Sequence, residues 1–141
     1  MTPASAATCL PHPLPTCPNA RVALFAMRRM GAHGLADARA AQAMFCAFRQ
    51  DFRRPLILLR ALLADLAANA AETIAIAPCC CARMTSAEGA LLAVIARVEQ
   101  QPDHSALLLA DLLGTRRVDG VLTSAAAVAA AFADSGRPIT L

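Results

Sequence analysis

From Asn19 onward, apolar residues recur at intervals of three and four, which is the spacing of one face of an α-helix. Hydrophobic residues make up 57% of the 141 residues. Much of that share is alanine, which favours helices without adding bulk. Strand signals are scarce, and the connections between periodic segments are short. The pattern therefore predicts an all-α fold, a compact bundle of about six helices in a single domain over residues 19–141.

Five prolines precede the helical region and predict an irregular leader over residues 1–18. Proline fixes φ and lacks an amide hydrogen, so a helix is not expected there. The first residues contain no basic segment followed by an apolar stretch, so no secretory signal is predicted and a cytoplasmic location is expected. No charge-free apolar run reaches the roughly 20 residues that a membrane-spanning helix needs. No membrane span is predicted.

The six expected helices begin near residues 19, 35, 55, 86, 102 and 124. Helical spacing predicts that the second presents a core face, made by Met44, Phe45, Phe48 and Phe52. The third begins at Pro55 and is apolar around most of its girth, so it should be the central helix. Thr123 or Ser124 is expected to cap the sixth.

An extended segment is expected over residues 73–78, where apolar residues alternate instead of following a helical period. It leads into Cys79, Cys80 and Cys81. Thr85 and Glu88 then have the spacing of a capping box, which predicts the start of the fourth helix. The cysteine triplet therefore lies just before an expected helix start.

Cys79, Cys80 and Cys81 are the least ordinary feature of the sequence. The unpaired amides and the positive dipole end of a helix N-terminus favour anions, including thiolates, and Arg83 would add a further positive charge. In a reducing cytoplasm, the six cysteines are expected to be thiols or metal ligands and not a disulfide framework. The triplet therefore suggests a metal site, an iron–sulfur site or thiol redox chemistry.

A metal site at the triplet would need donors from elsewhere, because zinc and iron–sulfur loops usually separate their cysteines by two or more residues. Adjacent side chains diverge, so one ion could take two of the three sulfurs. The remaining donors for zinc or an iron–sulfur cluster would come from Cys9, Cys17, Cys46, His12 or His33. The alternative is that the cysteines are small buried apolar side chains.

The basic residues of the chain are all Arg, and they are unevenly distributed. Residues 1–60 carry eight Arg against two acidic residues, whereas residues 61–141 carry five Arg against eight acidic residues. Five residues are spaced to share one helix face: Arg39, Gln42, Cys46, Arg49 and Arg53. Guanidinium groups among them would make the Cys46 thiol reactive if it is accessible, and otherwise Cys46 lies at the edge of a solvated basic stripe.

Arginine favours phosphate and carboxylate partners, so a second function is considered beside metal binding. It is a non-catalytic interaction module in which Arg39, Arg49 and Arg53 bind an acidic protein or nucleic acid. Nucleic acid is the less favoured partner, because the helix offers few residues typical of base readout. No catalytic motif is recognised, so no enzymatic activity is predicted.

Four segments of the sequence carry a resemblance to known proteins. They are Pro11–Pro15, Arg28–Gly34, Phe52–Leu56 and Ala77–Thr85, and the last contains the run Pro-Cys-Cys-Cys-Ala-Arg-Met-Thr. Together they resemble a family of small uncharacterised bacterial proteins, a domain of unknown function, over most of the chain from Pro11 to Pro138. The resemblance implies a bacterial cytoplasmic protein of about this length. It brings no activity, cofactor or catalytic residue.

Overall fold

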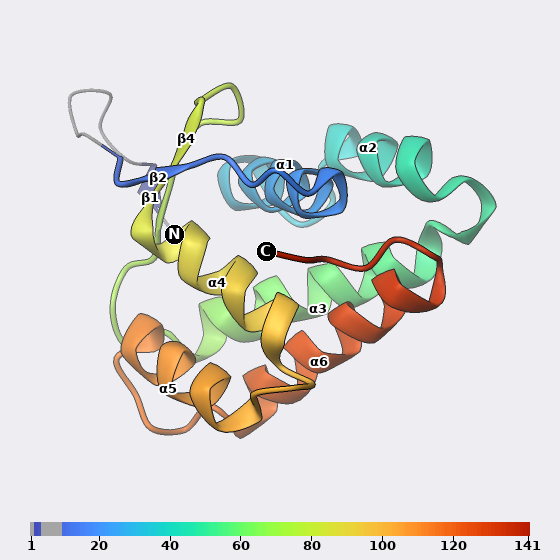
Figure 1. The fold of residues 1–141 in the computed structure, drawn as a ribbon. Helices are drawn as coiled ribbons and strands as arrows, with labels where there is room; N and C mark the ends of the chain where they lie inside the picture. The colour runs from blue at the N-terminus through green and yellow to red at the C-terminus, as the bar shows by residue number, and fades with distance from the viewer. Residues whose placement is uncertain (1, 4–9) are drawn as a thin grey trace.

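The computed structural model describes residues 2–3 and 10–141, and these contain six α-helices (Figure 1). The helices are α1 (Pro18–His33), α2 (Ala38–Phe48), α3 (Arg53–Asn69), α4 (Ser86–Arg97), α5 (Pro102–Leu113) and α6 (Asp119–Asp134). A short 3₁₀ turn, η1 (Arg49–Asp51), joins α2 to α3. Within the same residues, no helix combines the length and apolarity needed to cross a membrane. The prediction of an all-α fold is confirmed.

The core is centred on α3, which runs beside α6 (Figure 1). Its buried leucines are Leu56, Leu59, Leu62, Leu63 and Leu66. Burying one such side chain contributes about 1.5–3 kcal/mol, so this face is a main source of stability. Phe132 of α6 packs edge-to-face on Phe48 of α2, with ring centroids 4.9 Å apart. The central place predicted for the third helix agrees with this packing.

Two short strand pairs join the leader to the segment that carries the cysteine triplet. β1 (Thr2–Pro3) pairs in parallel with β3 (Ala75–Ile76), just before the triplet. β2 (His12–Pro13) pairs antiparallel with β4 (Arg83–Met84), just after it. The described parts of the leader therefore lie on both sides of the triplet, and the extended segment expected before the cysteines is present at β3.

Two helix ends follow the chemistry expected from the sequence. The Thr85 hydroxyl accepts a hydrogen bond from the Glu88 amide (3.0 Å), and the Glu88 carboxylate accepts one from the Thr85 amide (2.8 Å), which completes a capping box at α4. Gly114 ends α5 in the left-handed region with φ +68°. A Cβ there would lie 3.2 Å from the Glu72 side chain, so glycine suits both the backbone and the space.

The second expected helix is divided, and the predicted basic face on it is wrong. α2 begins later than expected because the Asp37 carboxylate caps it, accepting a hydrogen bond from the Ala40 amide (3.0 Å). Arg49 has φ +57°, which ends α2 at Phe48. Arg53 belongs to α3. Arg39 and Arg53 therefore do not lie on a common helix face.

One of the four expected core residues on the second helix faces solvent. Met44 and Phe48 are buried and Phe52 is half-buried, whereas Phe45 is 45% exposed. Phe45 packs edge-to-face on Phe52 at the surface, with ring centroids 5.3 Å apart. Phe45 shares α2 with the buried pair but lies on its solvent side, whereas the end of α2 at Phe48 separates Phe52 from that helix.

The sixth helix begins earlier than its predicted cap. α6 starts at Asp119, so Thr123 and Ser124 lie inside it. The Thr123 hydroxyl donates to the backbone carbonyl of Asp119 (2.9 Å), and the Ser124 hydroxyl donates to the Asp65 carboxylate of α3. The Thr123 hydroxyl therefore makes a hydrogen bond within α6, and the Ser124 hydroxyl links α6 to α3; neither caps the helix. The third helix also starts early, two residues before Pro55.

Candidate functional site

A buried ion pair between Arg28 of α1 and Glu88 of α4 anchors the cysteine segment. Arg28 Nε donates to Glu88 Oε2 (2.7 Å), and Arg28 Nη2 donates to Glu88 Oε1 (3.1 Å). The same guanidinium donates from Nη1 to the carbonyl oxygen of Cys81 (2.9 Å) and from Nη2 to that of Arg83 (2.8 Å). Buried charges persist only when paired and hydrogen-bonded, so this geometry ties the segment to α1.

The Glu88 carboxylate also binds backbone on both sides of the triplet. Oε2 accepts a hydrogen bond from the Ala77 amide (3.2 Å), and Oε1 accepts one from the Thr85 amide (2.8 Å). The Thr85 hydroxyl in turn donates to the carbonyl oxygen of Ala75 (2.8 Å). The chain before and after the cysteines is thereby fixed relative to α1 and α4.

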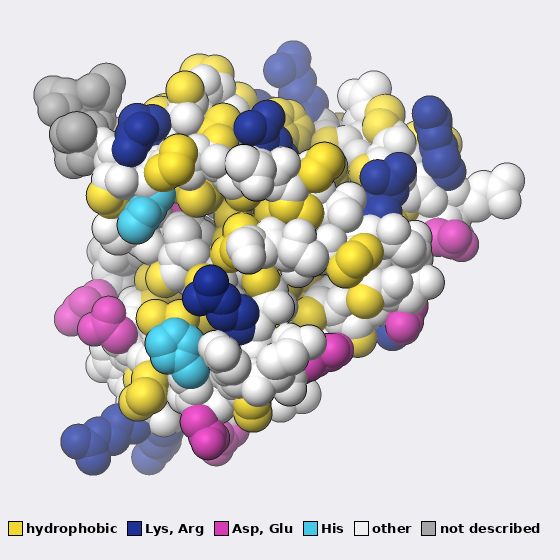
Figure 2. All heavy atoms as spheres, viewed as in Figure 1, with side chains coloured by type: hydrophobic (Ala, Val, Ile, Leu, Met, Phe, Trp, Pro, Cys, Tyr) yellow, Lys and Arg dark blue, Asp and Glu magenta, His cyan; other side chains and the backbone are white. Residues whose placement is uncertain are grey.

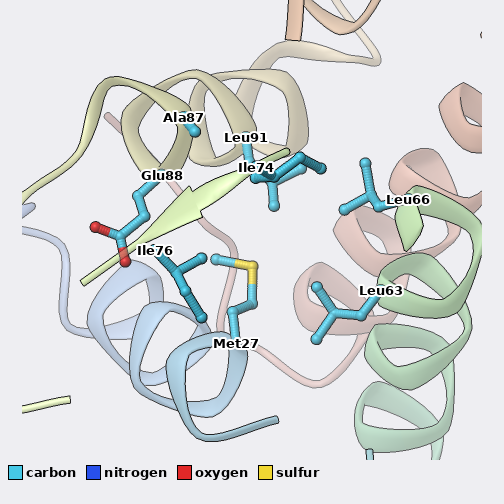
Figure 3. Close-up of a pocket in the computed structure, with 8 residues that line it drawn as sticks. All are labelled: Met27, Leu63, Leu66, Ile74, Ile76, Ala87, Glu88 and Leu91. Atoms are coloured by element: carbon cyan, nitrogen blue, oxygen red, sulfur yellow. The ribbon is translucent and has the colours of Figure 1, made fainter. Parts of the chain in front are cut away.

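A small apolar space beside Glu88 belongs to the core. It is lined by Met27, Leu63, Leu66, Ile74 and Leu91, among others (Figure 3). Its volume of about 10 Å³ corresponds to a single water molecule at most. Figure 3 shows the carboxylate oxygens of Glu88 directed away from Leu63 and Leu66. This space has neither the size nor the polar groups of a ligand site.

A larger cleft of about 180 Å³ lies between the end of α1 and the turn after β3. Besides Arg28, its lining residues are Arg29, Ala32 and His33 from α1, and Ile76, Ala77, Pro78 and Cys79 from the opposite side. Cys79 and Cys80 are both exposed, whereas Cys81 is half-buried. Of the three cysteines, only Cys79 lines this cleft. The cleft therefore brings a thiol, a guanidinium and an imidazole to the same space.

Asp37 holds the Arg29 guanidinium in place beside this cleft. Arg29 Nε donates to Asp37 Oδ2 (3.1 Å), and Nη2 donates to Oδ1 (2.9 Å). The hydrogen bonds from Arg29 lower the pKa of Asp37 to about 2. The pKa of Arg29 is raised, chiefly by the hydrogen bond with Asp37 and to a smaller extent by the nearby Cys79 side chain. A bidentate pair of this kind fixes the direction of the guanidinium as well as its charge.

Replacing Asp37 with Asn is expected to remove an acid-sensitive part of the stability. Because the folded pKa of about 2 lies below the ordinary value of 3.8, the carboxylate stabilises the fold above about pH 4, and this contribution is lost as the pH falls towards 2. Asparagine can still cap α2 but cannot pair with Arg29 as an ion. Thermal unfolding at about pH 5 and about pH 2.5 should show a Tm difference between wild type and Asp37→Asn that shrinks in acid. An unchanged difference would contradict this role.

The cysteine triplet lies just before α4, as the sequence predicted, but it is separated from the N-terminus of that helix. β4 intervenes, and the amide of Cys81 donates to the carbonyl oxygen of Pro78 (3.0 Å) in a turn of its own. The capping box occupies the α4 start. The proposed stabilisation of thiolates by that helix N-terminus therefore does not apply.

Among the cysteines that the structure describes, Cys17 is the one at a helix start, where it occupies the N-cap position of α1. Burial acts to raise its pKa, but hydrogen bonds from backbone amides, chiefly that of Thr140, outweigh burial, so the pKa of Cys17 is lowered. The side chain is half-buried, and its sulfur lies 3.8 Å from the carbonyl oxygen of Pro138. Cys17 is therefore a second thiol with a distinct environment, remote in sequence from the triplet.

The expected metal donors do not come together in the described part of the chain. Across residues 2–3 and 10–141, no three His, Cys, Asp or Glu side chains are placed to share a metal ion. Cys46 is exposed on α2. His12 lies against α4, where a Cβ at Gly89 would be 3.1 Å from its ring. Cys9 lies outside the described residues.

The arginines singled out in the sequence have different surroundings. Arg83 donates from Nε to the carbonyl oxygen of Leu10 (2.8 Å) and from Nη2 to that of Pro11 (3.1 Å), so it holds the leader. Arg39, Arg49 and Arg53 are exposed. Figure 2 shows basic side chains spread along the upper part of one face, with uncharged side chains between them.

Sequence reasoning missed the pairing of Arg28 with Glu88 and the place of Arg29 in the cleft. One signal was present, because Arg28 follows Leu24 by four residues and adjoins Met27 within the apolar stripe of α1. A charged side chain in such a stripe needs a buried partner. No comparable signal marked Glu88, whose capping-box role already accounted for a carboxylate at that position.

A family model described as a family of unknown function (DUF6628) matches residues 1–133. The chain belongs to this family. The match covers α1, the cysteine triplet and the cleft between them, and it confirms the expected relation to a domain of unknown function. Comparisons with curated proteins and with solved structures gave no match. For this member of DUF6628, function is therefore inferred from the chemistry of the cleft.

Proposed function

We propose that the protein carries out thiol–disulfide exchange at Cys79 with a small disulfide bound in the cleft. The observation that carries this proposal is the placement of an exposed thiol beside the guanidinium of Arg29, in a cleft that His33 also lines. Reactive cysteines are typically accessible and surrounded by positive groups. Cys80 is equally exposed but does not line the cleft, so the two neighbours are expected to react differently.

The exchange step can be written with Cys79 as the attacking sulfur. Cys79 loses its proton to solvent, and its thiolate attacks one sulfur of the bound disulfide. A new S–S bond forms to Cys79, the original S–S bond breaks, and the other half leaves as a thiolate that takes a proton from solvent. The Arg29 guanidinium favours the negative charge shared by the three sulfurs during transfer.

A second small thiol is expected to complete the cycle: its thiolate attacks the sulfur of the half bound to Cys79, a new small disulfide forms, and Cys79 leaves as a thiolate. Cys80 is a poor candidate for this role, because consecutive Cα atoms are about 3.8 Å apart and disulfides usually span about 4.4–6.8 Å. A rigid turn also favours an external partner. The backbone around the triplet is held by Arg28 and Glu88, which restricts the movement that an internal disulfide would need.

Metal binding by Cys79, Cys80 and Cys81 is the competing use of the same thiols. The exposure of Cys79 and Cys80 favours it, since a zinc or iron–sulfur site could draw further donors from another chain. Anaerobic purification followed by elemental analysis separates the two functions. Stoichiometric zinc or iron that disappears in Cys79→Ser would support metal binding, whereas metal below a tenth of an equivalent would count against it.

The rate of exchange with a neutral aromatic disulfide, dithiodipyridine, tests the proposal. Cys79→Ser should lose the fast phase of thione release, while the equally conservative Cys80→Ser should keep it. We expect the fast phase to exceed the rate of the exposed Cys46 thiol by at least about 10-fold, which corresponds to roughly 1.4 kcal/mol. Equal rates in the two serine variants would overturn the proposal, because exposure alone would then explain reactivity.

A further inference from the structure

The Arg29 guanidinium has unused donor capacity towards the cleft. An arginine side chain carries five N–H donors. Asp37 engages Nε and one donor of Nη2, the Cys79 side chain lies near the guanidinium, and among the described residues no oxygen atom accepts a hydrogen bond from Nη1. Because Asp37 fixes one edge of the guanidinium, the remaining donors are held in place before any ligand arrives. A fixed fork of N–H donors is well matched to a carboxylate.

The negative charge of Asp37 does not cancel this positive group completely. The Asp37 carboxylate also accepts the hydrogen bond from the Ala40 amide at the start of α2, so it is shared with the positive end of that helix. By contrast, Arg28, whose guanidinium also lines the cleft, donates two hydrogen bonds to the Glu88 carboxylate. It donates two more to the backbone carbonyl oxygens of Cys81 and Arg83. Of the two guanidinium groups that line the cleft, that of Arg29 therefore has more donors without a protein acceptor among the described residues.

The remaining walls limit the size of the ligand. Ala32, Ile76, Ala77 and Pro78 are apolar, and the cleft volume of about 180 Å³ lies below the roughly 300–1,000 Å³ of pockets for drug-sized molecules. A ligand with a short apolar stem, a sulfur at one end and a carboxylate at the other would match these groups. Its sulfur would lie against Cys79 and its carboxylate against Arg29.

We infer that the substrate of the cleft is a small disulfide that carries a carboxylate, bound through Arg29. This inference rests on the exchange proposed at Cys79 and adds the chemical class of the partner. It predicts that charge on the disulfide changes the rate at Cys79 more than the rate at Cys80, which is exposed but outside the cleft.

Three symmetrical disulfides of similar size test the inference: anionic dithiodiglycolate, neutral bis(hydroxyethyl) disulfide and cationic cystamine. Exchange is quenched at intervals, and fragment-ion mass spectrometry assigns the modified cysteine. In the wild-type protein, the anionic-to-cationic rate ratio at Cys79 should exceed that at Cys80 by at least about 10-fold, or roughly 1.4 kcal/mol. This comparison uses one folded protein and needs no variant.

Arg29→Gln and Arg29→Lys then identify the group responsible. Gln should reduce the ratio at Cys79 to that at Cys80, while Lys should keep part of it, because lysine retains the charge but not the fork. Thermal unfolding verifies that each variant is folded under the assay conditions. Equal ratios at Cys79 and Cys80 in the wild type would overturn the carboxylate inference. Faster reaction of Cys79 with the neutral disulfide would still support exchange, so the two proposals fail separately.

Discussion

Replacing Arg28 with methionine is expected to lower the free energy of unfolding by about 3–5 kcal/mol, because it leaves the Glu88 charge buried without its partner. The change also removes the donors to the carbonyl oxygens of Cys81 and Arg83. Total stabilities of small domains are only about 5–15 kcal/mol, so this loss should be evident in urea-induced unfolding followed by circular dichroism.

Arg54→Met provides the matched control for this substitution. Arg54 Nη1 also lies 2.9 Å from a carboxylate oxygen, that of Asp134, but both side chains are more than half exposed at 57% and 63%. Exposed pairs usually contribute about 0–1 kcal/mol. A loss in Arg28→Met no larger than that in Arg54→Met would contradict the structural role assigned to the buried pair.

Truncating Phe132 to alanine is expected to cost about 3–5 kcal/mol, since it empties a fully buried position between α6 and α2. Phe132 is 0% exposed and packs edge-to-face on Phe48. Phe45→Ala should cost far less, because Phe45 is 45% exposed and contacts Phe52 at the surface. The urea midpoints of the two variants are compared with that of the wild type. Similar losses in the free energy of unfolding would contradict the central position of Phe132 in the core.

Much of the helical architecture could be predicted because local chemistry determines it. The alternation before the cysteines, the Thr85–Glu88 capping box and the glycine end of α5 each depend on residues close in sequence. The division between α2 and α3 could not be predicted in the same way. It depends on a positive φ at Arg49, which is uncommon for a residue other than glycine and which the sequence does not signal.

The candidate site was only partly accessible to sequence reasoning. The triplet Cys79–Cys81 is evident as a motif, but its chemical surroundings come from α1, about fifty residues earlier in the chain. Arg28 and Arg29 are adjacent in sequence and yet have different tasks. One pairs with Glu88 in the interior and the other with Asp37 beside the cleft. Only tertiary packing distinguishes them.

Arg28 and Arg29 have different roles in the site. Arg28 immobilises the backbone of the cysteine turn through two carbonyl oxygens, and Arg29 contributes charge beside the thiol. A site held by side chains that are themselves fixed can keep its reacting groups aligned. We therefore expect substitutions of Arg28 to act mainly on the stability of the fold, and substitutions of Arg29 to act mainly on which ligand is bound.

Competition among the thiols of the wild-type protein tests directly whether Cys79 is the reactive cysteine. A small neutral disulfide is added at well below one equivalent, the reaction is quenched, and fragment-ion mass spectrometry locates the label. We expect Cys79 to be labelled first, ahead of its exposed neighbour Cys80 and of Cys17 with its lowered pKa. Preferential labelling of Cys80, Cys17 or Cys46 would contradict the assignment of the cleft as the reactive site.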